Sequence, residues 1–474
     1  MIQGLIQNTV KFDYPNKILN FVNGDFTEPS GHQYFEHISP HGEFTTQIAQ
    51  SQAIDLIKAL QLSHNTFEDW KISNLEDRKQ LALNIKKYLE THQNEIAALE
   101  AVAQGIRFKD SLEYNIKVAI TKLGQFVDEL DTGIDVNCTA TGVIAVVLSW
   151  NLSTRLFVES VIPAILAGNT VIVKTSSHSA VTAHLWGQLF QSVQAPKSLV
   201  QILNGSDSAF KNLLISHPGI KAVLSYSNLD HAAEIYHTVA RQSRQMAKKI
   251  QVHSGSKNIT AVVKELTENE MNQALQSFLV GQGQLHWNSG RLFILEKYEK
   301  NWTEFVEAKL NELKPYQSIF DDSLWTPIQK QKSKTDFNSI INLARKDQAK
   351  LISGQQEQID PRYLKPFFTK DMSNCSTLQQ DQVEAPAFIL STVKYPFDIA
   401  KYSNVSYYGF ASEIWTELDK NQKLINQIEV GNVILNHNTM SRYDLNLGVK
   451  QSIYGSTDRR IFGGFYSNVK KVIL

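Results

Sequence analysis

Apolar residues recur at intervals of three and four between residues 51 and 105, and most of the residues between them are polar. A spacing of this kind places the apolar side chains on one face of a helix. The sequence therefore predicts amphipathic helices that cover a sheet in this region. The apolar positions are Ala53, Leu56, Ile57, Leu60, Leu81, Ile85, Leu89, Ile96 and Leu99.

Beyond residue 143 the pattern changes to short apolar runs, rich in β-branched residues, that are separated by helical segments. This alternation is typical of βαβ units, whose strands form a parallel, doubly wound sheet. We expect a second α/β half from about Lys257 to Asn446, with a strand near Val433–Leu435. The other predicted strands are Val143–Val147, Val171–Val173, Val200–Leu203, Ala222–Leu224 and Ile259–Val263.

Length and composition narrow the class of protein. At roughly 150 residues per domain, a chain of 474 residues is expected to form two or three units. Apolar residues make up 42%, and 47 basic residues balance 47 acidic ones, so we expect a soluble protein that does not bind nucleic acid. No apolar run reaches the length of about 18 residues that spans a bilayer, so no membrane insertion is expected. Two cysteines, Cys138 and Cys375, and the lack of a signal sequence before Phe12 indicate a cytoplasmic location.

A series of short motifs runs through nearly the whole chain. The most specific is Pro163–Lys174, which reads Pro-Ala-Ile-Leu-Ala-Gly-Asn-Thr-Val-Ile-Val-Lys. The others are Asn20–Gly24, Thr141–Val146, Ser149–Leu152, Tyr408–Ser412, Gly431–Asn436, Gly448–Ser452 and Phe465–Val472. Together they resemble the aldehyde dehydrogenase superfamily. The resemblance implies an α/β fold with a Rossmann-type nucleotide-binding domain (residues 1–121 and 142–256), a catalytic-type α/β domain (257–446) and oligomerisation strands (122–141 and 455–474).

The segment Gly281–Arg291 resembles the loop that carries the family's catalytic cysteine, but His286 stands at the cysteine position. The family's mechanism needs a thiolate that attacks the aldehyde and holds it while hydride leaves for a nicotinamide ring. The family's general base is a Glu in a strand that reads Leu-Glu-Leu-Gly-Gly-Lys. The matching stretch here is Val252–Lys257, and His253 occupies the position of the Glu. The resemblance therefore implies that both the nucleophile and the carboxylate base are missing.

Three polar residues remain at the implied catalytic centre. Asn151 matches the family asparagine that donates to the oxyanion, although it can equally be a turn residue that closes the preceding strand. The family's fold implies that His253 and His286 face each other across one funnel. Such a pair can relay a proton or bind a transition metal, but zinc usually needs three or four protein ligands, and no third ligand is recognisable. The simpler interpretation is a decayed site without a metal.

The positions that hold the nicotinamide cofactor in the family are partly changed. Ser177 replaces the Glu that binds the ribose, so any residual binding would not be strictly selective for NAD. Tyr226 replaces the glycine that lets the pyrophosphate approach a helix N-terminus, and its phenol is expected to obstruct that approach or to fill an empty groove. The retained positions that a surviving NAD(P) site would use are Trp150, Lys174, Ser227, Gly255 and Glu384.

These losses favour a homologue without aldehyde dehydrogenase activity and without a bound cofactor. The expected role is that of a homo-oligomeric scaffold, dimer or tetramer, or of a partner for an active aldehyde dehydrogenase or pathway protein. One alternative is an NAD(P)-dependent oxidoreductase that acts on an aldehyde or acyl thioester by non-covalent chemistry, with His286 or His253 as the proton donor. Another is a sensor that binds a small metabolite in the emptied funnel, which Trp287 could line.

Overall fold

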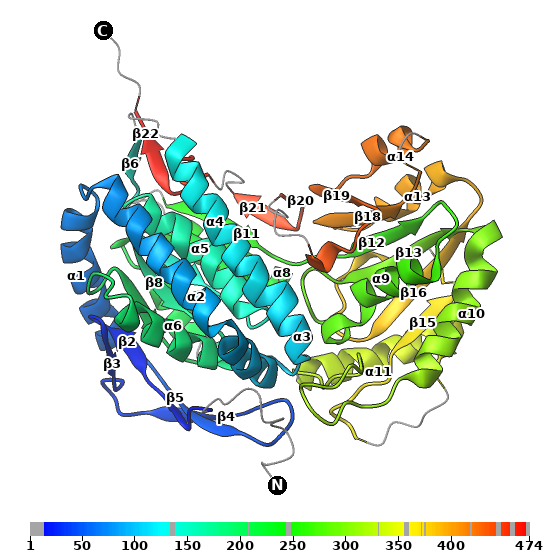
Figure 1. Cartoon of the computed structure of the whole chain (residues 1–474), viewed down its shortest axis with the longest axis horizontal. Helices are drawn as coiled ribbons and strands as arrows, with labels where there is room; N and C mark the ends of the chain where they lie inside the picture. Colours follow the sequence, from blue (N-terminus) through cyan, green and yellow to red (C-terminus); the bar gives the residue numbers. More distant parts are fainter. Residues whose placement is uncertain are drawn as a thin grey trace. The chain divides into compact units, whose positions relative to one another are not determined.

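The computed structural model describes residues 14–132, 138–206, 208–242, 248–329, 331–354, 360–370, 372–373, 376–417, 420–441, 447–455 and 460–470. The chain divides into two compact units (Figure 1). The eight-stranded unit contains the described residues up to Gln104, then Ser111–Ser254 and the described residues from Tyr454. The seven-stranded unit contains Gly105–Asp110 and Gly255–Ile453. Cys375, Asn446 and Phe12 lie outside the described residues.

The eight-stranded unit begins with strands and then alternates strands with helices. Its strands are β1 (Lys17–Ile18), β2 (Asn20–Val22), β3 (Asp25–Thr27), β4 (Tyr34–Ile38), β5 (Thr45–Ala49), β6 (Cys138–Ala140), β7 (Val143–Val147), β8 (Thr170–Lys174), β9 (Val200–Leu203), β10 (Ile220–Tyr226), β11 (Lys249–His253), β21 (Ile453–Gly455) and β22 (Ser467–Val469). Its helices are α1 (Ala53–Trp70), α2 (Leu75–Gln104), the π-helix η2 (Ser111–Ile116), α4 (Lys117–Thr132), α5 (Ser153–Leu166), the 3₁₀ turn η3 (Ser177–Ser179), α6 (Ala180–Ser192), α7 (Ser208–Ser216) and α8 (Leu229–Gln242).

The main sheet of this unit has the strand order β21-β11-β10-β7-β8-β9-β2-β3. The strands from β11 to β9 are parallel, and the chain runs outward from β7 in one direction through β8 and β9 and in the other through β10 and β11. This is the Rossmann-type order, with its switch point between β7 and β10. The predicted strands and the helices in residues 51–105 are confirmed, because α1 and α2 carry the apolar periodicity and β7 to β10 carry the apolar runs.

Helices cover both faces of this sheet, so its central strands are buried on both sides. Apolar side chains of α1, α7 and α8 pack on one face around alternate residues of β7, such as Val143, Ala145 and Val147. Of the apolar positions predicted at the start of this region, Leu56 and Leu60 belong to this core, whereas Ala53 and Ile57 are exposed, because Ala59 takes the inward position between Leu56 and Leu60. Helices α2, α4 and α5 lie side by side in the layer drawn in front of the sheet (Figure 1).

The seven-stranded unit repeats the α/β alternation. Its strands are β12 (Asn258–Val262), β13 (Ser289–Leu295), β14 (Lys350–Ser353), β15 (Phe367–Lys370), β16 (Ala387–Val393), β17 (Tyr408–Gly409), β18 (Ala411–Trp415), β19 (Asn432–Leu435) and β20 (Val449–Lys450). Its helices are α3 (Phe108–Asp110), α9 (Glu268–Leu279), the 3₁₀ turn η4 (Val280–Gly283), α10 (Glu296–Glu312), α11 (Gln331–Lys346), α12 (Thr377–Gln380), α13 (Pro396–Ser403), α14 (Gln422–Gln427) and the 3₁₀ turn η5 (Thr439–Ser441).

The sheet of this unit has the order β14-β15-β16-β13-β12-β18-β19, and β14 alone is antiparallel to its neighbour. Alternate residues of β13 face opposite helical layers. Leu292 and Ile294 pack against α9 and α10, whereas Phe293 and Leu295 pack against α13 and α14. The strand predicted at Val433–Leu435 is β19.

The strand expected within residues 122–141 is shorter than that range. Helix α4 extends to Thr132, because Leu123, Phe126 and Leu130 continue a helical spacing of buried side chains. Only Cys138–Ala140 forms a strand, β6, which pairs antiparallel with β22 in a separate two-stranded sheet. The β6/β22 sheet thus joins segments more than 300 residues apart in the chain (Figure 1).

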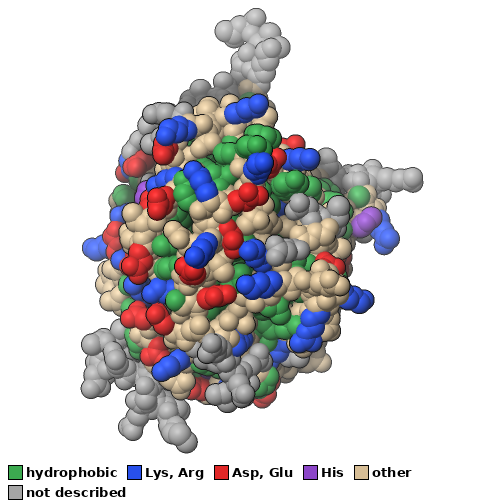
Figure 2. All heavy atoms as spheres, turned by 90° about the vertical axis from the view of Figure 1, so that its right-hand side faces the viewer, with side chains coloured by type: hydrophobic (Ala, Val, Ile, Leu, Met, Phe, Trp, Pro, Cys, Tyr) green, Lys and Arg blue, Asp and Glu red, His purple; other side chains and the backbone are tan. Residues whose placement is uncertain are grey.

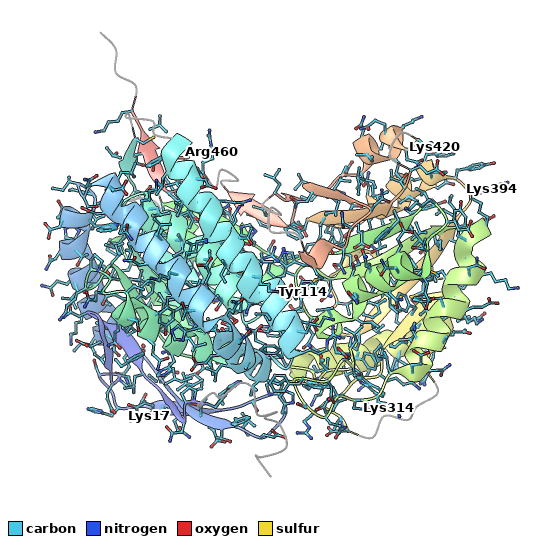
Figure 3. All side chains as sticks on the ribbon, viewed as in Figure 1. Lys17, Tyr114, Lys314, Lys394, Lys420 and Arg460 are labelled. Carbon is cyan, nitrogen blue, oxygen red and sulfur yellow. The ribbon has the colours of Figure 1, made fainter. Side chains whose placement is uncertain are left out.

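Charged side chains of both signs are mixed on the face drawn in Figure 2, and no large area of that face carries one sign. Lys314, Lys394 and Lys420 are exposed at the periphery of the seven-stranded unit (Figure 3). Among the described helices, none is long and apolar enough to cross a membrane.

Candidate functional site

The residues singled out in the eight-stranded unit gather at the carboxyl edge of its sheet. Asn151 follows β7, Tyr226 ends β10 and His253 ends β11. In open α/β sheets, ligands bind at this edge beside the switch point of the strand order, which here lies between β7 and β10. The topology therefore brings these three residues to the edge where a Rossmann-type fold places its ligand.

Asn151 lies in a tight connection between β7 and α5. Ser149 donates its hydroxyl to Oδ1 of Asn151 at 2.5 Å, and this contact fixes the orientation of the side-chain amide. Leu152 has a φ of 47°, an unusual value for a residue with a side chain, and its backbone N–H donates to Oε1 of Gln104 at 2.9 Å. The connection is therefore held by Gln104, a buried side chain of α2. Asn151 lies at the tip of the connection and is 8% exposed.

Tyr226 and His253 occupy paired positions on the adjacent parallel strands β10 and β11. Side chains at paired positions point to the same face of a sheet. Their rings are stacked, with centroids 4.4 Å apart and an angle of 13° between the planes. Both side chains are buried. Tyr226 and His253 thus pack as one unit.

A buried ion pair lies on the far side of Tyr226. The phenol hydroxyl is 3.5 Å from Oε2 of Glu159, and Oε1 of the same carboxylate accepts from Nε of Arg155 at 3.0 Å. Both charged residues lie on α5, one helical turn apart, and Arg155 is fully buried. A continuous row of buried contacts therefore runs along this edge of the sheet, from Arg155 through Glu159 and Tyr226 to His253.

The other expected cofactor residues of this unit are tied to the backbone. Nζ of Lys174, at the end of β8, donates to the carbonyl of Thr175 at 3.2 Å. The backbone N–H of Ser227 donates to the carbonyl of His253 at 2.8 Å, which extends the β10–β11 ladder by one residue. Trp150 is buried beside Asn151. Lys174 lies on the neighbouring strand of β7 and so belongs to the same carboxyl edge.

In the seven-stranded unit, the loop around His286 starts with three successive residues of positive φ. These are Gly281 (60°), Gln282 (58°) and Gly283 (69°). A Cβ atom at Gly283 would lie 2.7 Å from the carbonyl oxygen of Ala385, so the glycine is needed for space as well as for backbone geometry. Gln282 tolerates its conformation because Nε2 donates to the carbonyl of Leu324 at 2.6 Å.

Asn288 closes this loop from the inside. Its Oδ1 accepts from the backbone N–H of Leu285 at 2.7 Å, and its Nδ2 donates to the carbonyls of Ser277 and Val280, each at 3.0 Å. One buried amide therefore satisfies backbone groups at the end of α9 and in the loop that follows it. The role of Asn288 could not be predicted from the sequence, because nothing in its local pattern separates a loop-closing asparagine from an exposed one.

His286 lies at the tip of the loop and is half-buried. Its ring packs on Phe410 with centroids 4.2 Å apart and contacts the edge of Trp287. Its carbonyl accepts from Oγ of Ser256 at 2.6 Å and from Nδ2 of Asn258 at 3.1 Å. The tip of the loop thus carries an aromatic contact, and the segment that follows His253 in the chain anchors the loop.

Gly255 and Glu384 belong to the same unit. Gly255 has a φ of 130°, and a Cβ atom there would collide with the side-chain oxygen of Gln382. Glu384 is half-buried. His253 lies in the eight-stranded unit and His286 in the seven-stranded unit, so their meeting across a funnel stays a prediction of the resemblance. Within the described residues, no group of three or more His, Cys, Asp or Glu side chains is placed to hold a metal ion.

A buried carboxyl group supports the His286 loop from the sheet. Glu413 on β18 accepts from Oγ of Ser277 and from Nε1 of Trp415, each at 2.5 Å, and from the backbone N–H of Thr439 at 3.3 Å. Burial raises the pKa of Glu413 to about 8, and these three donors offset that shift only in part. Thr439 in turn donates its hydroxyl to the carbonyl of Trp287 at 3.1 Å. The carboxyl group is therefore largely neutral at pH 7 and is linked to the loop through one residue.

The family model for the aldehyde dehydrogenase family matches residues 26–472. The chain belongs to the aldehyde dehydrogenase family. Among curated proteins, it is 22% identical to the cytosolic 10-formyltetrahydrofolate dehydrogenase of Xenopus tropicalis, over 94% of this chain and 52% of that protein. It is 23% identical to the protein of the same name from Mus musculus, over 92% of this chain and 51% of that protein. This chain thus spans about half the length of these curated relatives.

Solved structures of the family share the fold. An indole-3-acetaldehyde dehydrogenase mutant, AldA of P. syringae in complex with NAD⁺ and IAA, matches with a TM-score of 0.86 and 20% identity, over 95% of each chain. An NADP-dependent enzyme of E. coli matches with a TM-score of 0.86 and 17% identity, over 96% of this chain and 97% of that chain. At these identities the similarity establishes the α/β aldehyde dehydrogenase fold, as the motifs predicted.

Proposed function

We propose that this aldehyde dehydrogenase family member does not use the thiolate chemistry of its family and acts through binding or assembly, as an oligomeric scaffold or as a partner of another protein. The observation that carries the proposal is the environment of the two changed positions. His286 packs on Phe410 where the family resemblance implies a thiol, and His253 stacks under Tyr226 where it implies a carboxylate. Without a sulfur at the loop tip, no thiohemiacetal forms.

The residues at the carboxyl edge do not fit a pyrophosphate at the position implied by the family. A Rossmann-type fold binds that group at a helix N-terminus, with backbone N–H groups close to the phosphate oxygens. Tyr226 ends β10 shortly before α8 begins, and its ring is held by His253 on one side and contacted by Glu159 at its hydroxyl. We therefore derive no hydride-transfer step for this chain.

The β6/β22 sheet supports an assembly role. It has only two strands, and Val469 of β22 is 64% exposed. A two-stranded sheet leaves unpaired backbone groups on its outer edges, and these can pair with a strand of another chain. The family resemblance implies oligomerisation through this part of the chain.

The second candidate is an oxidoreductase that uses a nicotinamide cofactor without a covalent intermediate. It is favoured by Asn151, whose amide lies at the carboxyl edge of β7, and by the NAD⁺ bound in a structural relative of the same fold. Bound nicotinamide would supply or accept the hydride. In this role Asn151 would donate to a carbonyl oxygen of the substrate.

Titration with NAD⁺, NADH, NADP⁺ and NADPH separates the two candidates. A ligand that binds the native state at 100 times its Kd stabilises it by about 3 kcal/mol, which a thermal-shift assay detects. We expect no shift for the unaltered chain up to millimolar nucleotide. We expect binding in Tyr226→Gly, which removes the phenol, and none in the control Tyr226→Phe, which keeps the ring. Micromolar binding to the unaltered chain would contradict the proposal and favour the oxidoreductase.

Light scattering of the unaltered chain tests the assembly role separately. We expect a mass of at least two copies at micromolar concentration, and loss of that mass in Val469→Lys, which places a charge on the exposed edge. A monomer that also fails to associate with an active aldehyde dehydrogenase would contradict the scaffold and partner roles.

A further inference from the structure

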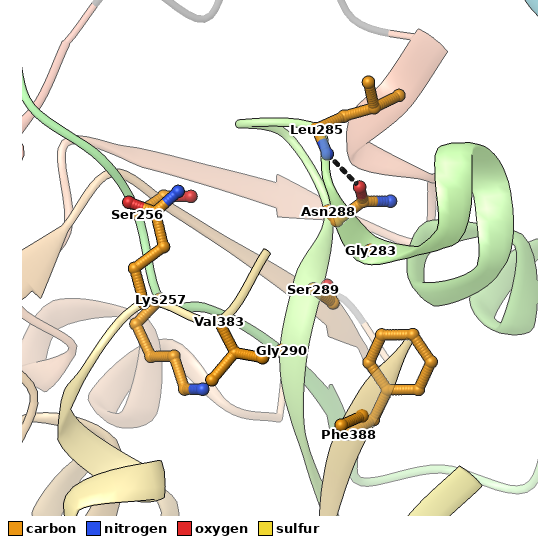
Figure 4. A pocket seen from close by; sticks show the side chains of 11 residues that line it. Ser256, Lys257, Gly283, Leu285, Asn288, Ser289, Gly290, Val383 and Phe388 are labelled. Carbon is orange, nitrogen blue, oxygen red and sulfur yellow. Dashed lines mark hydrogen bonds between the residues drawn. The ribbon is translucent and has the colours of Figure 1, made fainter. Parts of the chain in front are cut away.

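A small cavity lies in the seven-stranded unit directly beside the His286 loop (Figure 4). Its volume is about 20 Å³, which is room for about one water-sized molecule. Its wall comes from the loop, from the start of β13, from the segment just before β12, and from the start of β16 with the segment that precedes it. The residues that matter to its chemistry are Lys257, Asn288, Gly290 and Phe388.

Lys257 is 5% exposed, and its side chain runs along this cavity. In Figure 4 its amine end lies near Gly290 and Val383. A Cβ atom at position 290 would be 3.3 Å from Cδ of Lys257 and 3.5 Å from Cε and from Nζ. The missing side chain of Gly290 therefore gives the lysine its path to the cavity. No residue that the structure describes makes a hydrogen bond or ion pair with this amine.

The surroundings of the amine disfavour its protonated form. Burial and, to a smaller extent, the positive charge of Arg291 together lower the pKa of Lys257 to about 7, and Asp381 opposes the shift only in part. Arg291 is itself buried, and its guanidinium group donates to the carbonyls of Lys257 and Ser403 at 2.9 and 3.0 Å. About half of the Lys257 side chains are thus uncharged near neutral pH, and an uncharged amine is a nucleophile.

We propose that Lys257 captures a small aldehyde, of the size of formaldehyde, as a reversible imine in this cavity. Size selects the aldehyde, because the imine of formaldehyde adds only one carbon atom to the nitrogen, whereas a branched aldehyde adds more atoms than about 20 Å³ can hold. The capture does not depend on oligomerisation or on a nicotinamide, so it stands apart from the function proposed above.

The step is a condensation without electron transfer. The lone pair of the uncharged Lys257 nitrogen forms a bond to the carbonyl carbon. The nitrogen loses its two protons, the carbonyl oxygen takes them up and leaves as water, and a neutral carbon–nitrogen double bond remains. Water hydrolyses the product back to the amine and the aldehyde, so no oxidant, reductant or metal is required.

Reductive labelling of the intact chain tests the proposal. The protein is treated with isotope-labelled formaldehyde and cyanoborohydride at pH 7, and the methylation rate of each lysine is followed by peptide mass spectrometry. An exposed lysine, with a pKa of about 10.4, is uncharged in fewer than about one molecule in a thousand at this pH. We therefore expect Lys257 to be labelled on the order of 100 to 1000 times faster than the exposed Lys394 and Lys420.

Three comparisons make this labelling specific to the cavity. In urea the preference for Lys257 should vanish, because unfolding exposes all lysines to the same solvent. Isobutyraldehyde should not label Lys257 faster than Lys394 in the folded chain, because it does not fit. Gly290→Ala, whose added atom meets the lysine side chain, should slow the labelling of Lys257 and leave that of Lys394 unchanged. An unlabelled Lys257, or one labelled at the rate of Lys394, would overturn the proposal.

Discussion

Replacing Glu413 by Gln removes a titratable proton from the core of the seven-stranded unit and leaves its shape unchanged. The amide oxygen can still accept from Nε1 of Trp415, and the amide nitrogen can donate to Oγ of Ser277. The substitution therefore isolates the cost of ionising a buried carboxyl group beside the His286 loop.

The magnitude follows from the pKa of Glu413, which burial raises from 4.5 to about 8 in the folded chain. Between these pH values the unfolded chain has lost the proton that the folded chain retains. The free energy of unfolding therefore falls as pH rises through this window, by about 1.4 kcal/mol per pH unit and roughly 5 kcal/mol in all. In Glu413→Gln this contribution is absent, so the variant should gain stability relative to the unaltered chain from pH 5 to pH 8.

Urea unfolding followed by tryptophan fluorescence at pH 5, 6, 7 and 8 measures this difference, since Trp415 donates to the carboxyl group itself. Glu304→Gln is the matched control, because the Glu304 side chain is 65% exposed on α10. Its stability relative to the unaltered chain should not change with pH by more than a few tenths of a kcal/mol. A difference between Glu413→Gln and the unaltered chain that stays constant from pH 5 to pH 8 would refute the reasoning.

Three further predictions concern other buried positions. Gly255→Ala should lower the free energy of unfolding by about 1–3 kcal/mol in urea titrations, because φ of this residue is 130° and the new Cβ collides with Gln382. An unchanged urea midpoint would contradict the tight fit around Gly255. Arg155→Met should lower the free energy of unfolding by about 3–5 kcal/mol, because it leaves the buried Glu159 without its ion pair. The double variant Arg155→Met, Glu159→Gln should recover most of that loss. Equal losses in the single and the double variant would count against an electrostatic cause. The pKa of Lys257 is lowered to about 7 in the folded chain, so the unfolded chain binds more protons between pH 7 and pH 10. The free energy of unfolding of the unaltered chain should therefore rise with pH through that window, and that of Lys257→Met should not. Thermal melts of both proteins at pH 7, 8 and 9 measure this difference.

Much of the architecture could be predicted because it depends on local patterns. The apolar runs at Val143–Val147 and Val200–Leu203 are strands β7 and β9 with the predicted bounds. Strand β10 is longer than the predicted Ala222–Leu224, because Ser225 and Tyr226 pair with Val252 and His253 of β11. Pairing with a distant strand leaves no signal in a short window of sequence, so strand ends are harder to predict than strand cores.

The sequence by itself determined the family and the α/β alternation, and the family resemblance singled out His286, His253 and Tyr226, since motif spacing and periodicity are properties of neighbouring residues. Only the tertiary structure decided what surrounds those positions. Tyr226 stacks on His253 because β10 and β11 are adjacent, and Lys257 reaches a cavity because position 290 has no side chain. Burial and charge at a site depend on segments brought together from far apart in the chain. For this reason the chemistry of the Lys257 amine could not be predicted from the sequence.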